Sequence, residues 1–149
     1  MIVSSARALP LPGAITRGGR SGWLAALVAG VIFAGATLII PSLLARDTAF
    51  GLLAILLGMI ASVYLGYALA DGRLRAFQVE YVGIVAFTAL ATIALARHSA
   101  PLLALGYLGH GLWDLVHHRR GVEVRMPWWY VPLCLGYDTV VAIYVLVRF

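Results

Sequence analysis

The sequence predicts an all-α integral membrane protein, built as an up-down bundle of five transmembrane helices. Of its 149 residues, 62% are hydrophobic and only 11% are charged, whereas soluble domains carry roughly a quarter of charged residues. Five apolar stretches approach the length of about 20 residues that crosses a hydrocarbon core roughly 30 Å thick. Short connections separate these stretches, and short connections force neighbouring helices to run antiparallel.

The expected organisation is a short tail followed by one transmembrane domain. Residues 1–21 contain prolines, glycines and arginines but no continuous apolar core, so we expect a flexible, basic cytoplasmic tail and not a cleavable signal peptide. Residues 22–149 form the transmembrane domain. Its expected spans are residues 23–45, 48–70, 76–96, 101–118 and 127–147. The fourth is short and carries polar groups, and the bundle has four spans if residues 101–118 do not cross.

Arginine placement predicts the orientation of the chain, because positive residues close to span ends are retained on the cytoplasmic side. The tail, the second connection and the fourth connection hold eight arginines, whereas the opposite side holds three. We therefore expect a multi-pass protein of the inner (plasma) membrane, with its N-terminus in the cytoplasm and its C-terminus outside.

The same arginines lie between apolar runs and form no basic face, so no nucleic-acid partner is expected. Expected partners are membrane lipids and a lipophilic small molecule. In the first span, Ala26, Gly30 and Ala34 recur every four residues, a stripe of small residues that permits close helix approach. This stripe is compatible with internal packing and with a homodimer. The single cysteine, Cys134, excludes an intramolecular disulfide.

The fourth span contains the most informative pattern. His110, Asp114, His117 and His118 share one face of a helix. Such a polar stripe is expected to face the bundle interior, because its exposure to lipid would be costly. With a rise of about 1.5 Å per residue, Asp114 lies roughly 6 Å and His110 roughly 12 Å from the cytoplasmic end.

Carboxylates on other spans fall at comparable depths. Glu80 lies roughly 7 Å from the cytoplasmic end of the third span, and Asp138 lies roughly 16 Å deep, near the midplane. Intramembrane carboxylates cost at least a few kcal/mol each, which favours a functional interpretation. We expect catalytic roles for Glu80, His110, Asp114 and Asp138. Expected substrate contacts are Tyr64, Tyr67, Tyr107, Trp113 and Tyr137.

Each residue also has a structural interpretation. His117 and His118 adjoin two arginines and are compatible with an interfacial basic cluster. Glu80 is compatible with an ion pair to a nearby arginine. His110 is compatible with a hydrogen bond to Asp114, and Asp138 with an interhelical hydrogen bond to His110 or a tyrosine.

Three functions fit the pattern. The leading hypothesis is a small membrane-embedded enzyme that uses acid–base chemistry on a lipid-soluble, isoprenoid or sterol-like substrate in a cytoplasm-facing pocket. A histidine and a carboxylate one turn apart, His110 and Asp114, in a five-helix bundle are similar to the arrangement in the membrane sterol isomerases. The other hypotheses are a metal-binding protein and a non-enzymatic protein, either a proton-linked carrier or a subunit of a membrane complex.

The metal hypothesis rests on His110, Asp114, His117 and His118, because imidazole and carboxylate together suit one iron, zinc or manganese ion. The pattern H-x-x-x-D-x-x-H-H resembles one histidine box of the membrane desaturases and hydroxylases. Those enzymes need several such boxes, whereas this chain has four histidines in all, and His98 is expected on the opposite side of the membrane.

Overall fold

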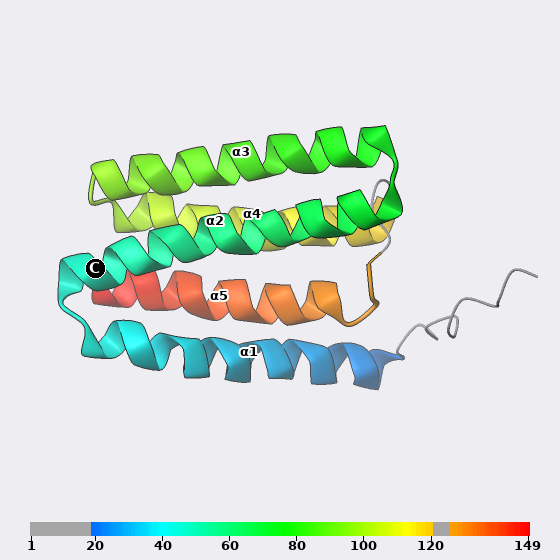
Figure 1. The fold of residues 1–149 in the computed structure, drawn as a ribbon. Helices are drawn as coiled ribbons and strands as arrows, with labels where there is room; N and C mark the ends of the chain where they lie inside the picture. Colours follow the sequence, from blue (N-terminus) through cyan, green and yellow to red (C-terminus); the bar gives the residue numbers. More distant parts are fainter. Residues whose placement is uncertain (1–18, 121–125) are drawn as a thin grey trace, which may run out of the picture.

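The computed structural model describes residues 19–120 and 126–149, apart from the side chains of Asp71 and of residues 117–120. Within these ranges the chain forms five α-helices and no strand (Figure 1), which confirms the predicted fold class. The helices are α1 (Arg20–Leu43), α2 (Arg46–Asp71), α3 (Leu74–Ala96), α4 (Ala100–Arg120) and α5 (Tyr130–Arg148). Most of the predicted tail, residues 1–18, lies outside the described residues.

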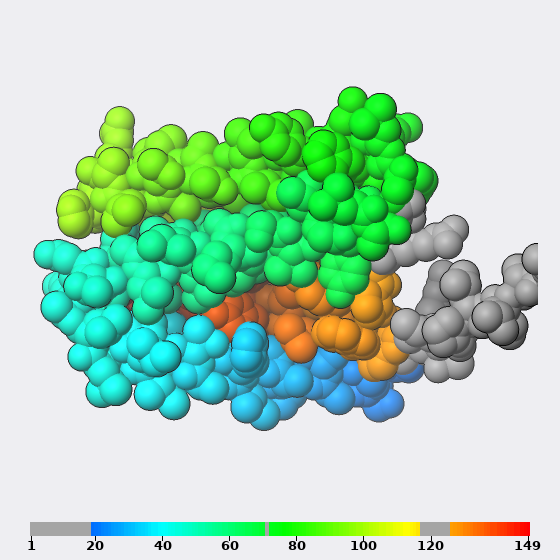
Figure 2. Space-filling model, viewed as in Figure 1, coloured from blue at the N-terminus to red at the C-terminus, as the bar shows by residue number. Residues whose placement is uncertain are grey.

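Consecutive helices run in opposite directions, but the last helix does not lie at the edge of the bundle. Helix α5 packs mainly against α1 and α4, while α2 packs mainly against α3. Helix α3 also packs against α4, and a weaker contact between α1 and α2 completes the arrangement. In the space-filling view of Figure 2, α5 is visible only as a narrow strip between α1 and α2. The final helix of the chain therefore occupies a central position.

The exterior of the bundle identifies a multi-pass membrane protein. Helices α1, α2, α3 and α5 are each long and apolar enough to cross a membrane. They expose large apolar side chains, such as Ile32 and Met59, that water would solvate poorly. Helix α4 is less apolar but has 21 residues, a length of about 31 Å. The side chains of His110 and Asp114 on this helix are buried, while those of Leu105 and Leu112 are exposed.

Two helices begin at other residues than the expected spans. Arg46 and Asp47 were expected in a connection but form the first turn of α2, where an acidic side chain is favoured near the positive end of the helix dipole. The last helix begins at Tyr130 and not at Pro127. The Tyr130 N–H donates to the Pro127 carbonyl, so the intervening tryptophans lie in a turn that precedes α5.

The predicted stripe of small residues packs within the chain. Ala26, Gly30 and Ala34 are all buried. A Cβ atom on Gly30 would lie 2.0 Å from the Leu133 carbonyl oxygen of α5. The backbones of α1 and α5 are therefore in direct contact, and a homodimer through this stripe would require α5 to move away.

The interior is divided lengthwise into an apolar part and a polar part. Near the start of α2, Leu53, Leu57 and Leu103 pack with residues of α5 such as Val141. The hydroxyl of Tyr107 crosses this region and donates to the Leu53 carbonyl at 2.7 Å. Toward the other end of α2, Tyr64 packs with residues of α5, and the buried polar side chains lie in this half.

We predict that Gly30→Ala lowers the stability of the bundle by about 1–3 kcal/mol, because the added methyl group overlaps a backbone carbonyl that cannot rotate away. The matched control is Gly35→Ala on the same helix, where a Cβ atom meets nothing within 4 Å. The measurement is the thermal unfolding midpoint in detergent. Equal midpoints for both variants would contradict the close contact between α1 and α5.

Candidate functional site

Three buried side chains from two helices form the centre of the polar half. His110 and Asp114 lie one turn apart on α4, and Asp138 reaches them from α5. The His110 Nδ1 atom lies 2.8 Å from Asp138 Oδ2, which is a hydrogen bond, and His110 Nε2 lies 3.9 Å from Asp114 Oδ1. All three side chains are at most 1% exposed. We refer to these residues as the His–Asp–Asp cluster.

The local sequence explains why α4 and α5 approach closely at this point. Gly111 follows His110 and faces α5, where an added Cβ atom would lie 3.6 Å from the Asp138 Cβ atom and 3.3 Å from the Leu135 side chain. The tight neighbour at this position is Leu135, whereas the distance to Asp138 is an ordinary van der Waals contact. The sequence pattern predicted both acids in the interior, and the structure brings them to the same histidine.

The cluster contains polar atoms without hydrogen bonds. Among the described residues, none meets strict hydrogen-bond geometry at His110 Nε2, at either carboxylate oxygen of Asp114, or at Asp138 Oδ1. The Tyr64 hydroxyl and the Cys134 thiol nevertheless lie beside the Asp114 carboxylate. Most buried polar groups in proteins are hydrogen-bonded, because an unpaired group loses its interaction with water without replacement. Four such atoms in one place indicate a site that is organised around something other than packing.

The hydrogen bond to an ionised Asp138 carboxylate defines the tautomer of the imidazole. A carboxylate accepts only, so the proton of this bond belongs to Nδ1. The second nitrogen, Nε2, then faces the Asp114 carboxylate at 3.9 Å. A lone pair directed toward a carboxylate is repelled, whereas a proton or a metal cation between the two groups is attracted to both. The space between Nε2 and Asp114 is therefore suited to a positive charge.

Aromatic rings enclose the imidazole. The rings of Phe87 on α3 and Tyr64 on α2 lie edge-on to His110, with centroid distances of 5.3 Å and 6.0 Å. Beside His110 is a crevice of about 150 Å³ that is too narrow to hold a water molecule. It is lined by Ala61, Tyr64, Glu80, Gly83, Ile84, Phe87, His110 and Trp113. Access to His110 from this side thus requires movement of these side chains.

Glu80 lies across this crevice on α3 and is 1% exposed. Its Oε2 atom accepts a hydrogen bond of 3.3 Å from the indole Nε1 of Trp113. Trp113 was predicted to contact substrate, and in the structure it holds Glu80 and lines the crevice. The structure therefore places Glu80 of α3 at the same crevice as His110 of α4.

The other predicted residues are distributed more widely. Tyr107 donates to a backbone carbonyl of α2, and Tyr137 packs on Phe33 of α1 with a centroid distance of 5.4 Å. Both tyrosines connect helices and neither lines the crevice. Tyr67 is half-buried and contacts Tyr130 at 5.6 Å. The side chains of His117 and His118 lie outside the described residues, so their predicted metal-binding role stays a prediction.

Sequence reasoning missed two neighbours of the cluster. Cys134 was given no place at the site, but its thiol adjoins the Asp114 carboxylate. Phe87 was not singled out and contacts the imidazole. A signal existed for Cys134, because it precedes Asp138 by four residues and so shares its face of α5. No comparable signal existed for Phe87, whose position depends on how α3 packs on α4.

The cluster also offers donors for a metal ion. One nitrogen or oxygen atom from each of His110, Asp114 and Asp138 can be chosen so that all three lie within 4.8 Å of one another. This set overlaps the predicted metal set in His110 and Asp114 but includes Asp138, which was predicted as a catalytic residue only.

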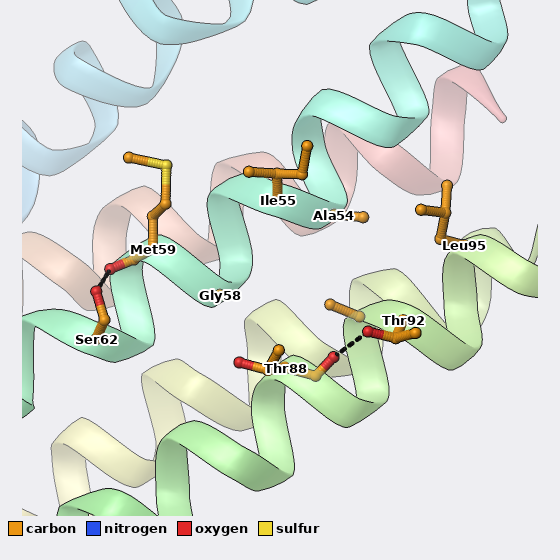
Figure 3. Close-up of a pocket in the computed structure, with 9 residues that line it drawn as sticks. Ala54, Ile55, Gly58, Met59, Ser62, Thr88, Thr92 and Leu95 are labelled. Carbon is orange, nitrogen blue, oxygen red and sulfur yellow. Dashed lines mark hydrogen bonds between the residues drawn. The ribbon is translucent and has the colours of Figure 1, made fainter.

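A separate groove of about 380 Å³ lies between α2 and α3, away from the cluster (Figure 3). Its two bonded hydroxyls are satisfied within their own helices: Thr92 donates to the Thr88 carbonyl and Ser62 to the Met59 carbonyl. None of the predicted site residues lines this groove.

Fold and site together define a multi-pass helical membrane protein with a buried His–Asp–Asp cluster. The chain belongs to a family of unknown function, DUF6010, whose family model matches residues 25–148. The match includes the whole cluster and nearly all of the five described helices. No curated protein and no solved structure matches the chain.

We predict that His110 and Asp138 are energetically coupled. Removal of either partner leaves the other buried without its hydrogen bond, so the double variant His110→Ala/Asp138→Ala should be less destabilised than the sum of the single variants by about 1–3 kcal/mol. The measurement is denaturant-induced unfolding in detergent. The control pair is His110→Ala with Asp47→Ala, whose effects should add. Additive effects for both pairs would contradict the hydrogen bond.

Proposed function

We propose that the chain is a membrane-embedded enzyme that performs acid–base chemistry on a lipid-soluble, isoprenoid or sterol-like substrate at the His–Asp–Asp cluster. The observation that carries the proposal is the 2.8 Å hydrogen bond between His110 and Asp138. It orients the imidazole and directs Nε2 toward a second buried carboxylate. An oriented imidazole with one reactive nitrogen is the usual arrangement of a general base or acid.

Each member of the site receives a distinct role in this proposal. Asp138 fixes the orientation of the ring, and Nε2 of His110 exchanges a proton with the substrate. Asp114 stabilises positive charge next to Nε2, since its carboxylate lies 3.9 Å away. Glu80, on the other side of the crevice, is positioned to act on the opposite face of a bound group. Acid–base catalysis by a placed side chain typically contributes about 10²–10⁴-fold in rate.

The surroundings of the cluster favour an apolar substrate. The crevice beside His110 is bounded by aromatic and aliphatic side chains from α2, α3 and α4. Helices α2 and α3 also expose apolar side chains such as Ile55 and Val82, which are compatible with surrounding hydrocarbon. We infer that a lipid-soluble molecule enters from this side when Tyr64 and Phe87 move.

We predict that wild-type protein, reconstituted in liposomes with isoprenoid alcohols and a sterol in D₂O, converts one of these lipids or introduces deuterium into it. Liquid chromatography with mass spectrometry measures both outcomes. His110→Ala and Asp138→Asn should lose about 100-fold or more of the rate. Asp47→Asn, an exposed acid at the other end of the bundle, is the control.

Two results would overturn the proposal. One is unchanged conversion by folded His110→Ala and Asp138→Asn proteins, since the chemistry would then lie elsewhere. The other is the absence of conversion or labelling by the wild-type protein, together with proton-dependent flux across the same liposomes, which would indicate a carrier.

We also propose that the chain resides in the inner (plasma) membrane with its N-terminus in the cytoplasm and its C-terminus outside. The distribution of arginines supports this orientation. A phosphatase that is active only outside the cytoplasm should be active when fused after Phe149 and inactive when inserted at Gly72, in the α2–α3 connection. The reverse pattern of activities would show the opposite orientation.

A further inference from the structure

We propose that the His–Asp–Asp cluster binds one divalent transition-metal cation, with His110, Asp114 and Asp138 as its protein ligands. This inference goes beyond the proposed enzymatic function and does not depend on it. It rests on the donor atoms, on their lack of hydrogen-bond partners and on the balance of charge around them.

The donor atoms are close to a coordination geometry. One atom from each residue lies within 4.8 Å of the other two. Metal–nitrogen and metal–oxygen bonds of about 2.0–2.2 Å place ligand atoms roughly 3–4 Å apart. Nε2 of His110 and Oδ1 of Asp114 already face each other across 3.9 Å. Asp114 already faces Nε2, whereas Asp138 would have to turn from Nδ1 toward the ion, because the two ring nitrogens point in nearly opposite directions.

The unpartnered atoms are ligands of the right kind. His110 Nε2 and Asp138 Oδ1 have no hydrogen bond with a described residue, and the two Asp114 oxygens have only the nearby Tyr64 hydroxyl and Cys134 thiol outside strict geometry. The side chains of His110, Asp114 and Asp138 are at most 1% exposed. The hydrogen bond from His110 Nδ1 uses only Oδ2 of Asp138, so Oδ1 of this carboxylate stays without a partner. The same bond leaves the Nε2 lone pair available for a cation.

The charge around the cluster also calls for a cation. The groups that act most strongly on the Asp114 carboxylate are His110, Tyr64, Asp138 and Cys134. Only His110 among them can carry a positive charge, and Glu80 adds a further carboxylate nearby. A divalent ion would compensate the two aspartates while the imidazole stays neutral, as a ligand must.

The donor set indicates which ions fit. One imidazole nitrogen with carboxylate oxygens suits zinc, iron or manganese, and three protein ligands leave a coordination position for water or substrate. An ion at this place would occupy the space between Nε2 and Asp114 that we assigned to positive charge. An ion bound there would use the Nε2 lone pair, so the proton exchange proposed for Nε2 belongs to the metal-free protein.

The test uses the full chain, purified in mild detergent with an affinity tag that contains no histidine. After treatment with a chelator, the protein is titrated with Zn²⁺, Mn²⁺ and Fe²⁺, and the bound metal is measured by inductively coupled plasma mass spectrometry. Co²⁺ serves as a spectroscopic probe of the ligands. We expect about one equivalent of at least one ion, a visible Co²⁺ spectrum and a higher unfolding temperature in the presence of the ion.

Variants assign the ligands. His110→Ala and the isosteric Asp114→Asn and Asp138→Asn should weaken metal binding at least about tenfold. They should also lose the metal-dependent rise in unfolding temperature. The controls His98→Ala and Asp47→Asn alter an exposed histidine and an exposed acid and should bind as wild type does.

The outcomes separate this inference from the proposed function. Absence of binding by wild-type protein, or equal binding by His110→Ala, overturns the metal site. If metal-free protein still converts lipid, the enzymatic proposal stands alone. If the metal binds at the three ligands but no lipid is converted, the metal site stands and the enzymatic proposal fails.

Discussion

The hydrogen bond between His110 and Asp138 is the interaction on which the polar interior of this bundle depends. Hydrocarbon offers no hydrogen-bond partner, so a histidine and two aspartates are tolerated in a membrane only when they meet one another inside the protein. The bond joins α4 to α5 at 2.8 Å. It accounts for the position of α5 beside α4 and for the burial of the face of α4 that carries His110 and Asp114.

Close packing of α1 supports this arrangement from the opposite side of α5. At Gly136, two residues before Asp138, an added Cβ atom would lie 2.4 Å from the Leu27 carbonyl oxygen. With Gly30 facing Leu133, the backbones of α1 and α5 touch at two places. Helix α1 contributes no side chain to the cluster, yet its contact with α5 limits how far Asp138 can shift along the bundle.

Much of the fold follows from the sequence because one-dimensional properties determine it. Apolar length predicts the helices, and the period of a helix predicts that His110 and Asp114 share a face. Depth from the span ends also placed Glu80 near this face.

The order of helices around the bundle cannot be predicted in this way, because it depends on contacts between distant segments. The sequence therefore did not show that α5 lies between α1 and α4, nor that Asp138 would meet His110 at Nδ1. The same limit explains why Tyr107 and Tyr137, expected at the site, instead connect helices.

The central position of α5 has a consequence for biogenesis. Helices enter the membrane in the order of synthesis, so α1 and α4 are both present before the segment that joins them. Until then, the imidazole of His110 has no Asp138 to bind, and α4 is a weakly hydrophobic segment with an incomplete polar face. Final assembly must insert α5 between helices that are already in the bilayer. The contacts of α5 with α1 and α4 can therefore form only after the last helix has been made, whereas α2 and α3 can pack together before it.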